Sequence, residues 1–146
     1  MLYLVHHADA LDSDVDPQRP LSPQGRDHAA ALARRLAARG VRPVAIWHSG
    51  KLRARQTAEA CLFGCNPSAE FKAIRGLQPT DPPDWIRDFL SGETRDVMIV
   101  SHFPLLPRLL AVLTEGRGSG VEASFPLHGA VALEPEEDLW KELWRE

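Results

Sequence analysis

Short apolar runs alternate along the chain with longer amphipathic segments, and this pattern predicts strands that alternate with helices. The apolar runs with the clearest strand character are residues 2–5, 43–49 and 96–102. Residues 70–74 and 130–133 carry a weaker form of the same pattern. The sequence therefore predicts five strands before its last segment, spread over the whole length of the chain.

The amphipathic segments contain residues that start and stop helices. Ser22 suits the N-cap of a first helix, with Pro23 at the first helical position. Gly40 ends this helix. Apolar residues at roughly helical spacing, with prolines and glycines near the ends, predict three further helices at residues 51–63, 82–92 and 103–116.

The segment "LWKELW" (139–144) follows the turn-forming sequence Pro-Glu-Glu-Asp at 135–138. Its apolar residues fit neither the helical nor the strand period cleanly. We predict a strand here, because the preceding turn would close a hairpin with residues 130–133.

Strands alternating with helices form βαβ units, which build a mostly parallel sheet covered by helices on both faces. We therefore predict an α/β fold, a three-layer α/β/α sandwich with a mostly parallel central sheet. A chain of 146 residues is long enough for one core, so we expect a single domain spanning residues 1–146.

Composition and charge narrow the possible functions. The net charge of −3 creates no field that would attract nucleic acid or acidic membranes, so we expect neither as a partner. The N-terminus lacks the basic residues of a signal peptide, and no segment approaches the roughly 20 apolar residues of a membrane span. Cys61 and Cys65 are too few for a disulfide framework, and we expect a reduced, cytoplasmic protein.

Polar side chains follow three of the predicted strands. His6 and His7 come after the first strand, Ser49 and Arg53 after the second, and His102 after the strand at 96–102. Ligands of open α/β sheets bind outside the carboxyl ends of the strands, so we expect these side chains to converge at one edge of the sheet.

This set of residue types suits an anion. The guanidinium of Arg53 offers a planar pair of donors that matches phosphate oxygens. His102 stands at the start of a predicted helix, where the helix dipole and the backbone N–H of Phe103 favour phosphate. A neutral imidazole can attack phosphorus, and a protonated one can stabilise transition-state charge. A metal site formed by His6, His7 and His102 is an alternative, but it lacks carboxylate or thiolate partners.

Four motifs stand in an order and spacing that resemble the histidine phosphatase superfamily, and within it the small branch of SixA-type bacterial phosphohistidine phosphatases. They are "LVHHADA" (4–10), "RPLSPQGR" (19–26), "HSGKLRARQTAEA" (48–60) and "VSHFPLL" (100–106). The resemblance implies a phosphoglycerate-mutase-like fold and a reaction without metal or cofactor.

The resemblance also implies roles for individual residues. His7 matches the histidine that becomes phosphorylated, Arg53 a phosphate-binding arginine, and His102 the second catalytic histidine. Arg19 matches an arginine common in this branch, which edges the pocket or braces the loop. Asp81 lies where small relatives carry an acidic residue, so it is the candidate proton donor; a helix N-cap or loop role is its alternative.

His6 departs from the family pattern, because most members have arginine at this position. A protonated His6 could partly replace that charge, which predicts activity that falls as pH rises through the His6 pKa. The alternative is a half-buried imidazole bonded to a loop carboxylate. Strand alternation would direct His6 and His7 to opposite sides unless the strand has already ended.

The sequence therefore predicts a metal-independent phosphohydrolase that works through a phosphohistidine on His7. Its substrate is expected to be phosphorylated, either a protein phosphohistidine or a small phosphomonoester. The alternative is a phosphate-sensing or protein-binding module that has lost turnover because of His6. His128 could approach the pocket from the tail, but the sequence does not show it, and the oligomeric state stays open.

Overall fold

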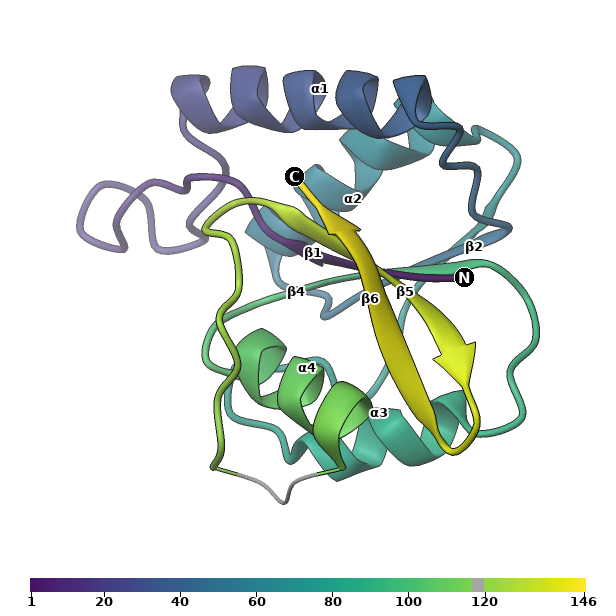
Figure 1. Ribbon diagram of the computed structural model, residues 1–146. Helices are drawn as coiled ribbons and strands as arrows, with labels where there is room; N and C mark the ends of the chain where they lie inside the picture. Colours follow the sequence, from purple (N-terminus) through teal and green to yellow (C-terminus); the bar gives the residue numbers. More distant parts are fainter. Residues whose placement is uncertain (117–119) are drawn as a thin grey trace.

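The computed structural model describes residues 1–116 and 120–146. Within these residues the strands form one sheet, in the order β3-β2-β4-β1-β5-β6 (Figure 1). The strands are β1 (Leu2–His6), β2 (Ala45–His48), β3 (Glu70–Ala73), β4 (Val97–Ser101), β5 (Ala130–Glu136) and β6 (Leu139–Arg145). All the predicted strands are thus present.

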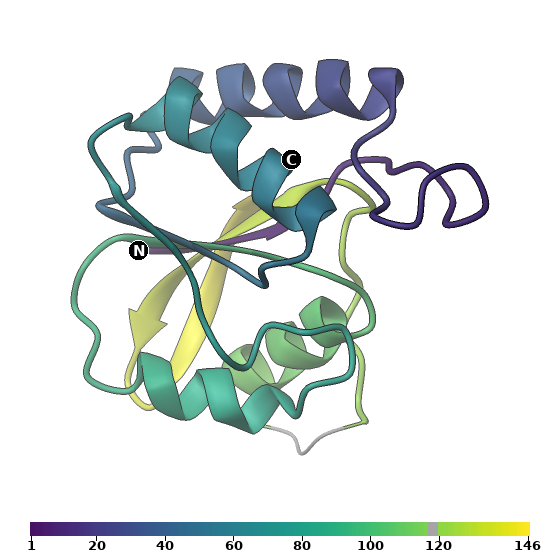
Figure 2. The ribbon, with the colours of Figure 1, turned by 180° about the vertical axis from the view of Figure 1, so that it is seen from behind.

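Helices cover both faces of this sheet. One pair lies above it in Figure 1 and the other below, and the view from behind in Figure 2 shows the same three layers. The pairs are α1 (Pro23–Ala38) with α2 (Leu52–Cys65), and α3 (Pro83–Leu90) with α4 (Leu105–Glu115). The predicted three-layer α/β/α sandwich is confirmed. Among the described residues, no helix combines the length and the apolar character needed to cross a bilayer.

The alternation of β1 divides the core into two layers. Leu2 and Leu4 pack into the cluster on the α3–α4 side, whereas Tyr3 and Val5 pack into the cluster on the α1–α2 side. All five residues of β1 are buried, which explains the continuous apolar run at residues 2–5.

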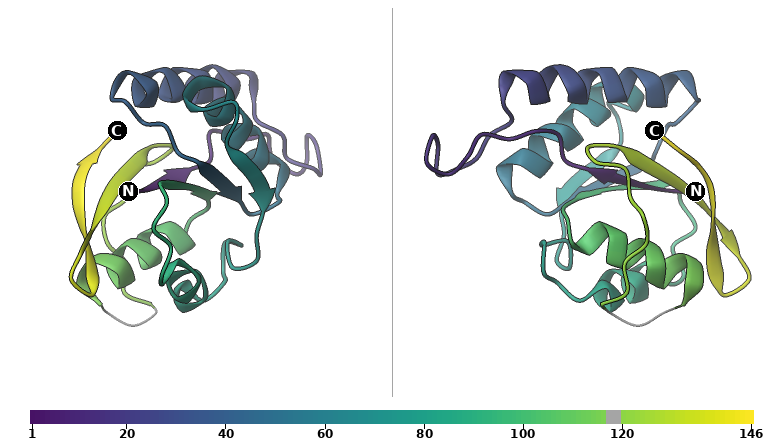
Figure 3. Two further views of the ribbon diagram at one scale, coloured as in Figure 1. Left: turned by 90° about the vertical axis from the view of Figure 1, so that its right-hand side faces the viewer. Right: turned by 60° about the vertical axis from the view of Figure 1, so that its left-hand side comes forward.

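The sheet combines parallel and antiparallel pairing. β1 and β2 each pair in parallel with β4, and β3 pairs in parallel with β2. β5 runs antiparallel to β1, and β6 antiparallel to β5. The hairpin of β5 and β6 forms one side of the sheet, as the two views of Figure 3 show. The mostly parallel sheet is therefore confirmed for its N-terminal part, with an antiparallel extension at the C-terminal end.

Two predicted boundaries are wrong. The hairpin turn lies at Glu137 and Asp138, because β5 continues through Pro135. Pro135 is tolerated in this strand because β1 pairs only as far as Leu133, which leaves one side of β5 without a ladder partner there. In addition, α4 begins at Leu105 and not at residue 103, so His102 precedes the helix by three residues.

The start of α1 is fixed as the sequence predicts. The Ser22 hydroxyl accepts a hydrogen bond from the Gly25 N–H at 2.9 Å, and Pro23 is the first helical residue. A Cβ atom on Gly25 would lie 1.9 Å from the carbonyl oxygen of Asp9, so only glycine fits at this approach. This contact holds the loop after β1 against α1.

Candidate active site

The register of the three neighbouring strands aligns their carboxyl ends. His6 lies opposite Ser101 across the β1–β4 ladder, and His48 lies opposite Val100 across the β2–β4 ladder. The residues that follow these ends therefore meet at one edge, as predicted. The rings of His7 and His102 have centroids 5.0 Å apart.

His6 and His7 lie on the same side of the sheet edge. Their ring centroids are 4.5 Å apart. Strand alternation does not separate them, because β1 ends at His6 and His7 already belongs to the following loop.

His7 carries its proton on Nδ1, which donates a hydrogen bond of 2.7 Å to the Ala8 carbonyl. The lone pair is therefore on Nε2. The pKa of His7 is lowered to about 4, mainly by burial. The hydrogen bond to Ala8 raises this pKa, whereas the positive charge of Arg53 lowers it. At neutral pH the ring is uncharged, with a nucleophilic nitrogen available.

His102 is fixed by Ser49, whose Oγ lies 2.6 Å from His102 Nε2. The same Oγ accepts a hydrogen bond from the Lys51 N–H, and we assign its hydroxyl proton to the contact with Nε2. The proton of His102 is then on Nδ1. This atom is buried and has no hydrogen-bond partner among the described residues.

The pKa of His102 is lowered to about 2, first by burial and then by His7 and Arg53. Four neighbouring groups (His7, Arg53, Lys51 and His6) and low solvation oppose the charged form of His102. In this structure His102 offers a neutral N–H donor. A buried donor of this kind is costly unless a ligand accepts its hydrogen bond.

Arg53 lies in the first turn of α2, beside the loop that carries His7. The Thr57 hydroxyl donates to the Arg53 carbonyl at 2.9 Å and accepts the Ala8 N–H at 3.0 Å. Thr57 thus ties this turn to the loop after β1. The Arg53 Nε is buried without a hydrogen-bond partner among the described residues, a second donor suited to an anion.

Arg19 braces the loop and adds charge. Its Nε donates to the Leu11 carbonyl at 3.0 Å. Its positive charge also helps to lower the pKa values of His7 and Arg53, although burial is the larger cause for both. Both predicted uses of Arg19, bracing the loop and edging the pocket, are compatible with this placement.

His6 is neutral and buried. Its Nδ1 accepts a hydrogen bond of 2.8 Å from the His128 N–H, so its own proton is on Nε2. Its ring stacks on Phe103, with centroids 4.2 Å apart, and on His128, with centroids 4.9 Å apart. Burial, followed by the neighbouring His7 and His128, lowers its pKa to about 3.

The surroundings of His6 in this structure favour its neutral form, because its pKa is low and a backbone N–H occupies Nδ1. A protonated His6 that binds phosphate stays a prediction. The expected bond to a loop carboxylate is replaced by a bond to a backbone N–H. His6 therefore supplies a donor without the charge of an arginine.

His128, which the sequence left open as a residue that could approach the pocket, lies in the histidine cluster. Its Nδ1 donates to the His7 carbonyl at 2.7 Å, and its ring lies against His6. It arrives here because β5 runs antiparallel to β1, which brings the start of β5 to the end of β1; the His6 N–H donates to the Gly129 carbonyl. The sequence would have placed His128 in the site only if it had shown that these two strands pair antiparallel.

One ring nitrogen each of His6, His7 and His128 lies within 4.8 Å of the other two, which raises the question of a metal ion. The Nδ1 of His6 is occupied by a backbone N–H, and its Nε2 carries a proton. Only His7 and His128 keep a lone pair. Two imidazoles without a carboxylate or thiolate fall short of the three protein ligands that zinc usually requires.

Two acidic residues, the candidate Asp81 and also Asp9, make contacts within loops. Asp81 accepts the Gln78 N–H at 2.9 Å, and the Gln78 side chain donates to the Ser49 carbonyl at 2.6 Å. Asp9 accepts the Ser22 hydroxyl at 2.6 Å. Asp81 thus closes a turn that supports Ser49, and its role as a proton donor stays a prediction.

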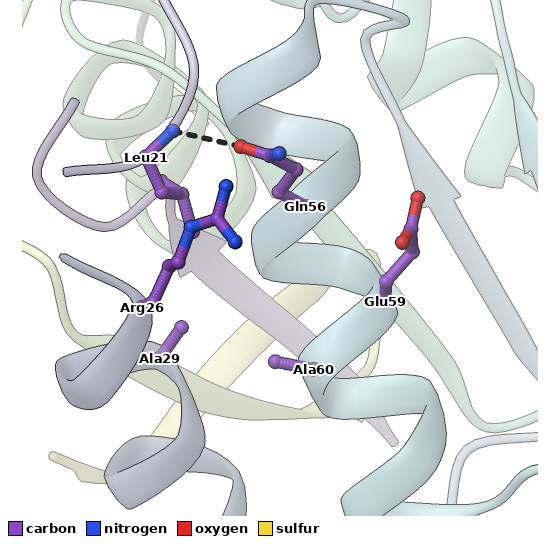
Figure 4. A pocket seen from close by; sticks show the side chains of 6 residues that line it. All are labelled: Leu21, Arg26, Ala29, Gln56, Glu59 and Ala60. Carbon is purple, nitrogen blue, oxygen red and sulfur yellow. Dashed lines mark hydrogen bonds between the residues drawn. The ribbon is translucent and has the colours of Figure 1, made fainter. Parts of the chain in front are cut away.

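A separate hollow of about 190 Å³ lies between α1 and α2 (Figure 4). Its lining contains no histidine, and the Leu21 N–H bonds across it to the Gln56 side chain at 2.7 Å. Its residues are Leu21, Arg26, Ala29, Gln56, Glu59 and Ala60. This hollow is therefore separate from the histidine cluster.

Comparison with known proteins agrees with this geometry. The model of the histidine phosphatase superfamily (branch 1) matches residues 2–86. The chain belongs to the histidine phosphatase superfamily. This family region includes His7 and Arg53, whereas His102 and His128 lie beyond it.

Members of the SixA-type branch of this superfamily resemble the chain over most of its length. It is 29% identical over 120 residues to the phosphohistidine phosphatase SixA of Escherichia coli K12, covering 79% of this chain and 74% of the relative. A structure of the protein histidine phosphatase SixA complexed with tungstate superimposes with a TM-score of 0.85 at 25% identity, covering 99% of this chain and 94% of the other.

The fold is also shared with a putative SixA from Agrobacterium tumefaciens, with a TM-score of 0.79 at 23% identity over 99% of this chain and 96% of the other. The predicted family, its SixA-type branch, the phosphoglycerate-mutase-like fold and the phosphatase class are confirmed.

Proposed function

We propose that the chain hydrolyses phosphohistidine or a related phosphoryl compound through a covalent phosphohistidine on Nε2 of His7. The observation that carries this proposal is the proton placement on His7. Its Nδ1–H is bound to the Ala8 carbonyl, and its pKa of about 4 leaves Nε2 unprotonated at neutral pH. The nucleophile therefore needs no base to activate it.

The phosphoryl oxygens are held by donors from separate elements. Arg53 contributes its guanidinium, including the unpaired Nε, and His102 contributes its Nδ1–H. His6 adds its Nε2–H, in place of the arginine usual in the family, and the backbone N–H of Phe103 is a further candidate. Phosphoryl transfer depends mainly on such positioning and charge stabilisation.

We assign a protein phosphohistidine as the preferred substrate class. The relatives named as phosphohistidine phosphatases support it, because the chain aligns with them over most of its length. His7 and His128 are both only partly buried, which leaves the cluster open to an approaching side chain. We also propose a reducing, cytoplasmic setting, which is supported by the two buried free thiols of Cys61 and Cys65.

A labelling experiment tests the nucleophile. The protein is incubated with [32P]phosphoramidate or a [32P]phosphohistidine peptide, quenched, and analysed for acid-labile, alkali-stable label. Wild type is expected to carry label that disappears as phosphate is released, and His7→Ala is expected to carry none. His28→Ala, a change at an exposed histidine on α1, is the matched control and should label like wild type. Unchanged label in His7→Ala contradicts the proposal.

A phosphate-binding module without turnover is the second candidate. Neutral His6 favours it, because the pocket has one cation fewer than the family pattern provides. Loss of one such interaction costs on the order of 10²–10³ in rate. This candidate predicts that wild type binds phosphate in calorimetry and neither becomes labelled nor releases phosphate; turnover by wild type excludes it.

A further inference from the structure

We propose that His128 is the proton-transfer residue of the reaction, giving a proton to the leaving group and then taking one from water. The inference rests on the proposed function, because it assumes that His7 receives the phosphoryl group. It assigns a catalytic role to a residue outside the region that matches the superfamily.

The position of His128 suits direct contact with the reacting atoms. One ring nitrogen of His128 lies within 4.8 Å of one ring nitrogen of His7. Since Nδ1 of each residue is bound to a backbone carbonyl, the nitrogens left for chemistry are the two Nε2 atoms. Reacting atoms stand about 3–3.5 Å apart before bonds form, and the two rings, with centroids 6.2 Å apart, are close enough to contact one phosphoryl group and its leaving atom.

The positions of the protons and lone pairs on the ring nitrogens distinguish His128 from the other histidines of the cluster. His6 Nδ1 accepts a backbone N–H, which leaves His6 only a donor at Nε2. His102 Nε2 is bound to Ser49, which leaves it only a donor at Nδ1. His7 uses its lone pair as the nucleophile. His128 Nε2 is then the remaining imidazole nitrogen that can both release and accept a proton.

His128 is also held in a defined orientation. Its φ of +53° lies in the left-handed region, which residues other than glycine adopt only with support. That support comes from the bond of its N–H to His6, the bond of its Nδ1 to the His7 carbonyl, and the stacking on the His6 ring. A fixed ring keeps Nε2 directed at the reacting atoms, as a proton donor requires.

The two steps balance in atoms and charge. The cycle starts with His128 as the imidazolium, which carries a proton on each ring nitrogen. In the first step, the His7 Nε2 lone pair forms a bond to phosphorus, the bond from phosphorus to the leaving nitrogen or oxygen breaks, and that atom takes the Nε2 proton of His128, which becomes neutral. In the second, water bonds to phosphorus and gives a proton to His128 Nε2. The bond from phosphorus to His7 breaks, and its electron pair returns to His7 Nε2 as phosphate leaves.

The test compares leaving groups in the variant His128→Asn. Asparagine tolerates a positive φ and can keep a donor near the Nδ1 position. With phenyl phosphate, whose poor leaving group needs a proton, we expect the rate of label formation to fall about 10²–10⁴-fold. With 4-nitrophenyl phosphate the loss should be under about tenfold, and label should accumulate because attack by water is slowed.

A second variant separates chemistry from packing. His128→Gly also accepts the positive φ, and added imidazole should restore its rate with phenyl phosphate at least tenfold. Equal losses with both substrates in His128→Asn, or no rescue of His128→Gly, overturn the assignment. Asp81→Asn tests the rival donor; if it shows the leaving-group split and His128→Asn does not, Asp81 is the proton donor. Absence of label in wild type would instead contradict the proposed function itself.

Discussion

Protons in the histidine cluster are placed by partners that are themselves fixed. Carbonyls of Ala8 and His7 hold the Nδ1 protons of His7 and His128, and a backbone N–H blocks Nδ1 of His6. Adjacent histidines in the sequence therefore have different functions: His7 offers a lone pair, and His6 offers an N–H. Sequence alone could not give this division, because it depends on the neighbours of each ring nitrogen.

The pH dependence of label formation tests the protonation state of His7. Its lone pair is lost only when pH falls through its pKa of about 4, since the folded pKa lies below the ordinary value of 6.5. We expect His7 to contribute no step to the rate of label formation from phosphoramidate between pH 7 and 5.5, and to lower this rate towards pH 4. Pre-steady-state quench measurements provide the rate. A midpoint near 6.5 that persists in His128→Asn would show that His7 is not held neutral by its surroundings.

Replacing His6 by arginine tests whether this residue is a simple substitute for the family's cation. His6→Arg removes the acceptor of the His128 N–H and introduces a charge between two stacked rings. We expect the free energy of unfolding to fall by about 1–3 kcal/mol, as measured by urea denaturation. His6→Asn, which can keep an acceptor for that N–H, should lose less. A stabilised or more active His6→Arg variant would contradict the role given to His6.

At the scale of elements, the site is assembled by the ends of strands and by two links between a helix and the loop after β1. One link is the contact of this loop with Gly25 at the start of α1, and the other is the pair of hydrogen bonds made by Thr57 of α2. The carboxyl ends of β1, β2 and β4 were predictable from their apolar runs and from the rule for open α/β sheets. The start of α1 was predictable from Ser22 and Pro23. The position of His128 was not, because the weak strand pattern at 130–133 did not reveal which strand β5 would pair with.

Thr57 provides a test of the link between α2 and the loop of His7. Thr57→Val removes both hydrogen bonds of a fully buried hydroxyl while keeping the shape of the side chain. The Ala8 N–H then lacks an acceptor, and we expect a loss of about 1–3 kcal/mol in the free energy of unfolding and weaker phosphate binding through Arg53. Thr57→Ser, which keeps the hydroxyl, is the control. Equal affinity for phosphate in Thr57→Val and wild type would show that Thr57 does not position Arg53.

For the whole molecule, the uncharged histidines link stability to pH. The folded pKa values of His6, His7 and His102 are about 3, 4 and 2, below the unfolded value of 6.5. The unfolded chain therefore binds more protons as pH falls below 6.5, and stability must fall with it. The carboxylates of an unfolded chain stay largely ionised above about pH 4.5, so the histidines dominate between pH 6.5 and 4.5.

Urea denaturation at several pH values measures this linkage. We expect the free energy of unfolding to decrease from pH 6.5 to 4.5, with a proton difference approaching about one for each buried imidazole. His102→Asn should reduce the slope, because it removes one of these groups. Constant stability over this range would mean that the cluster takes up protons in the folded state.

The central claim is that His7 Nε2 is the nucleophile in a pocket whose donors are set by Arg53, His102 and His6. A crystal structure of the protein with orthovanadate, which adopts the geometry of phosphoryl transfer, tests it most directly. We expect vanadium within bonding distance of His7 Nε2, with its oxygens hydrogen-bonded to Arg53, His102 Nδ1 and His6 Nε2. Vanadate bound through another residue, or away from the histidine cluster, would contradict it.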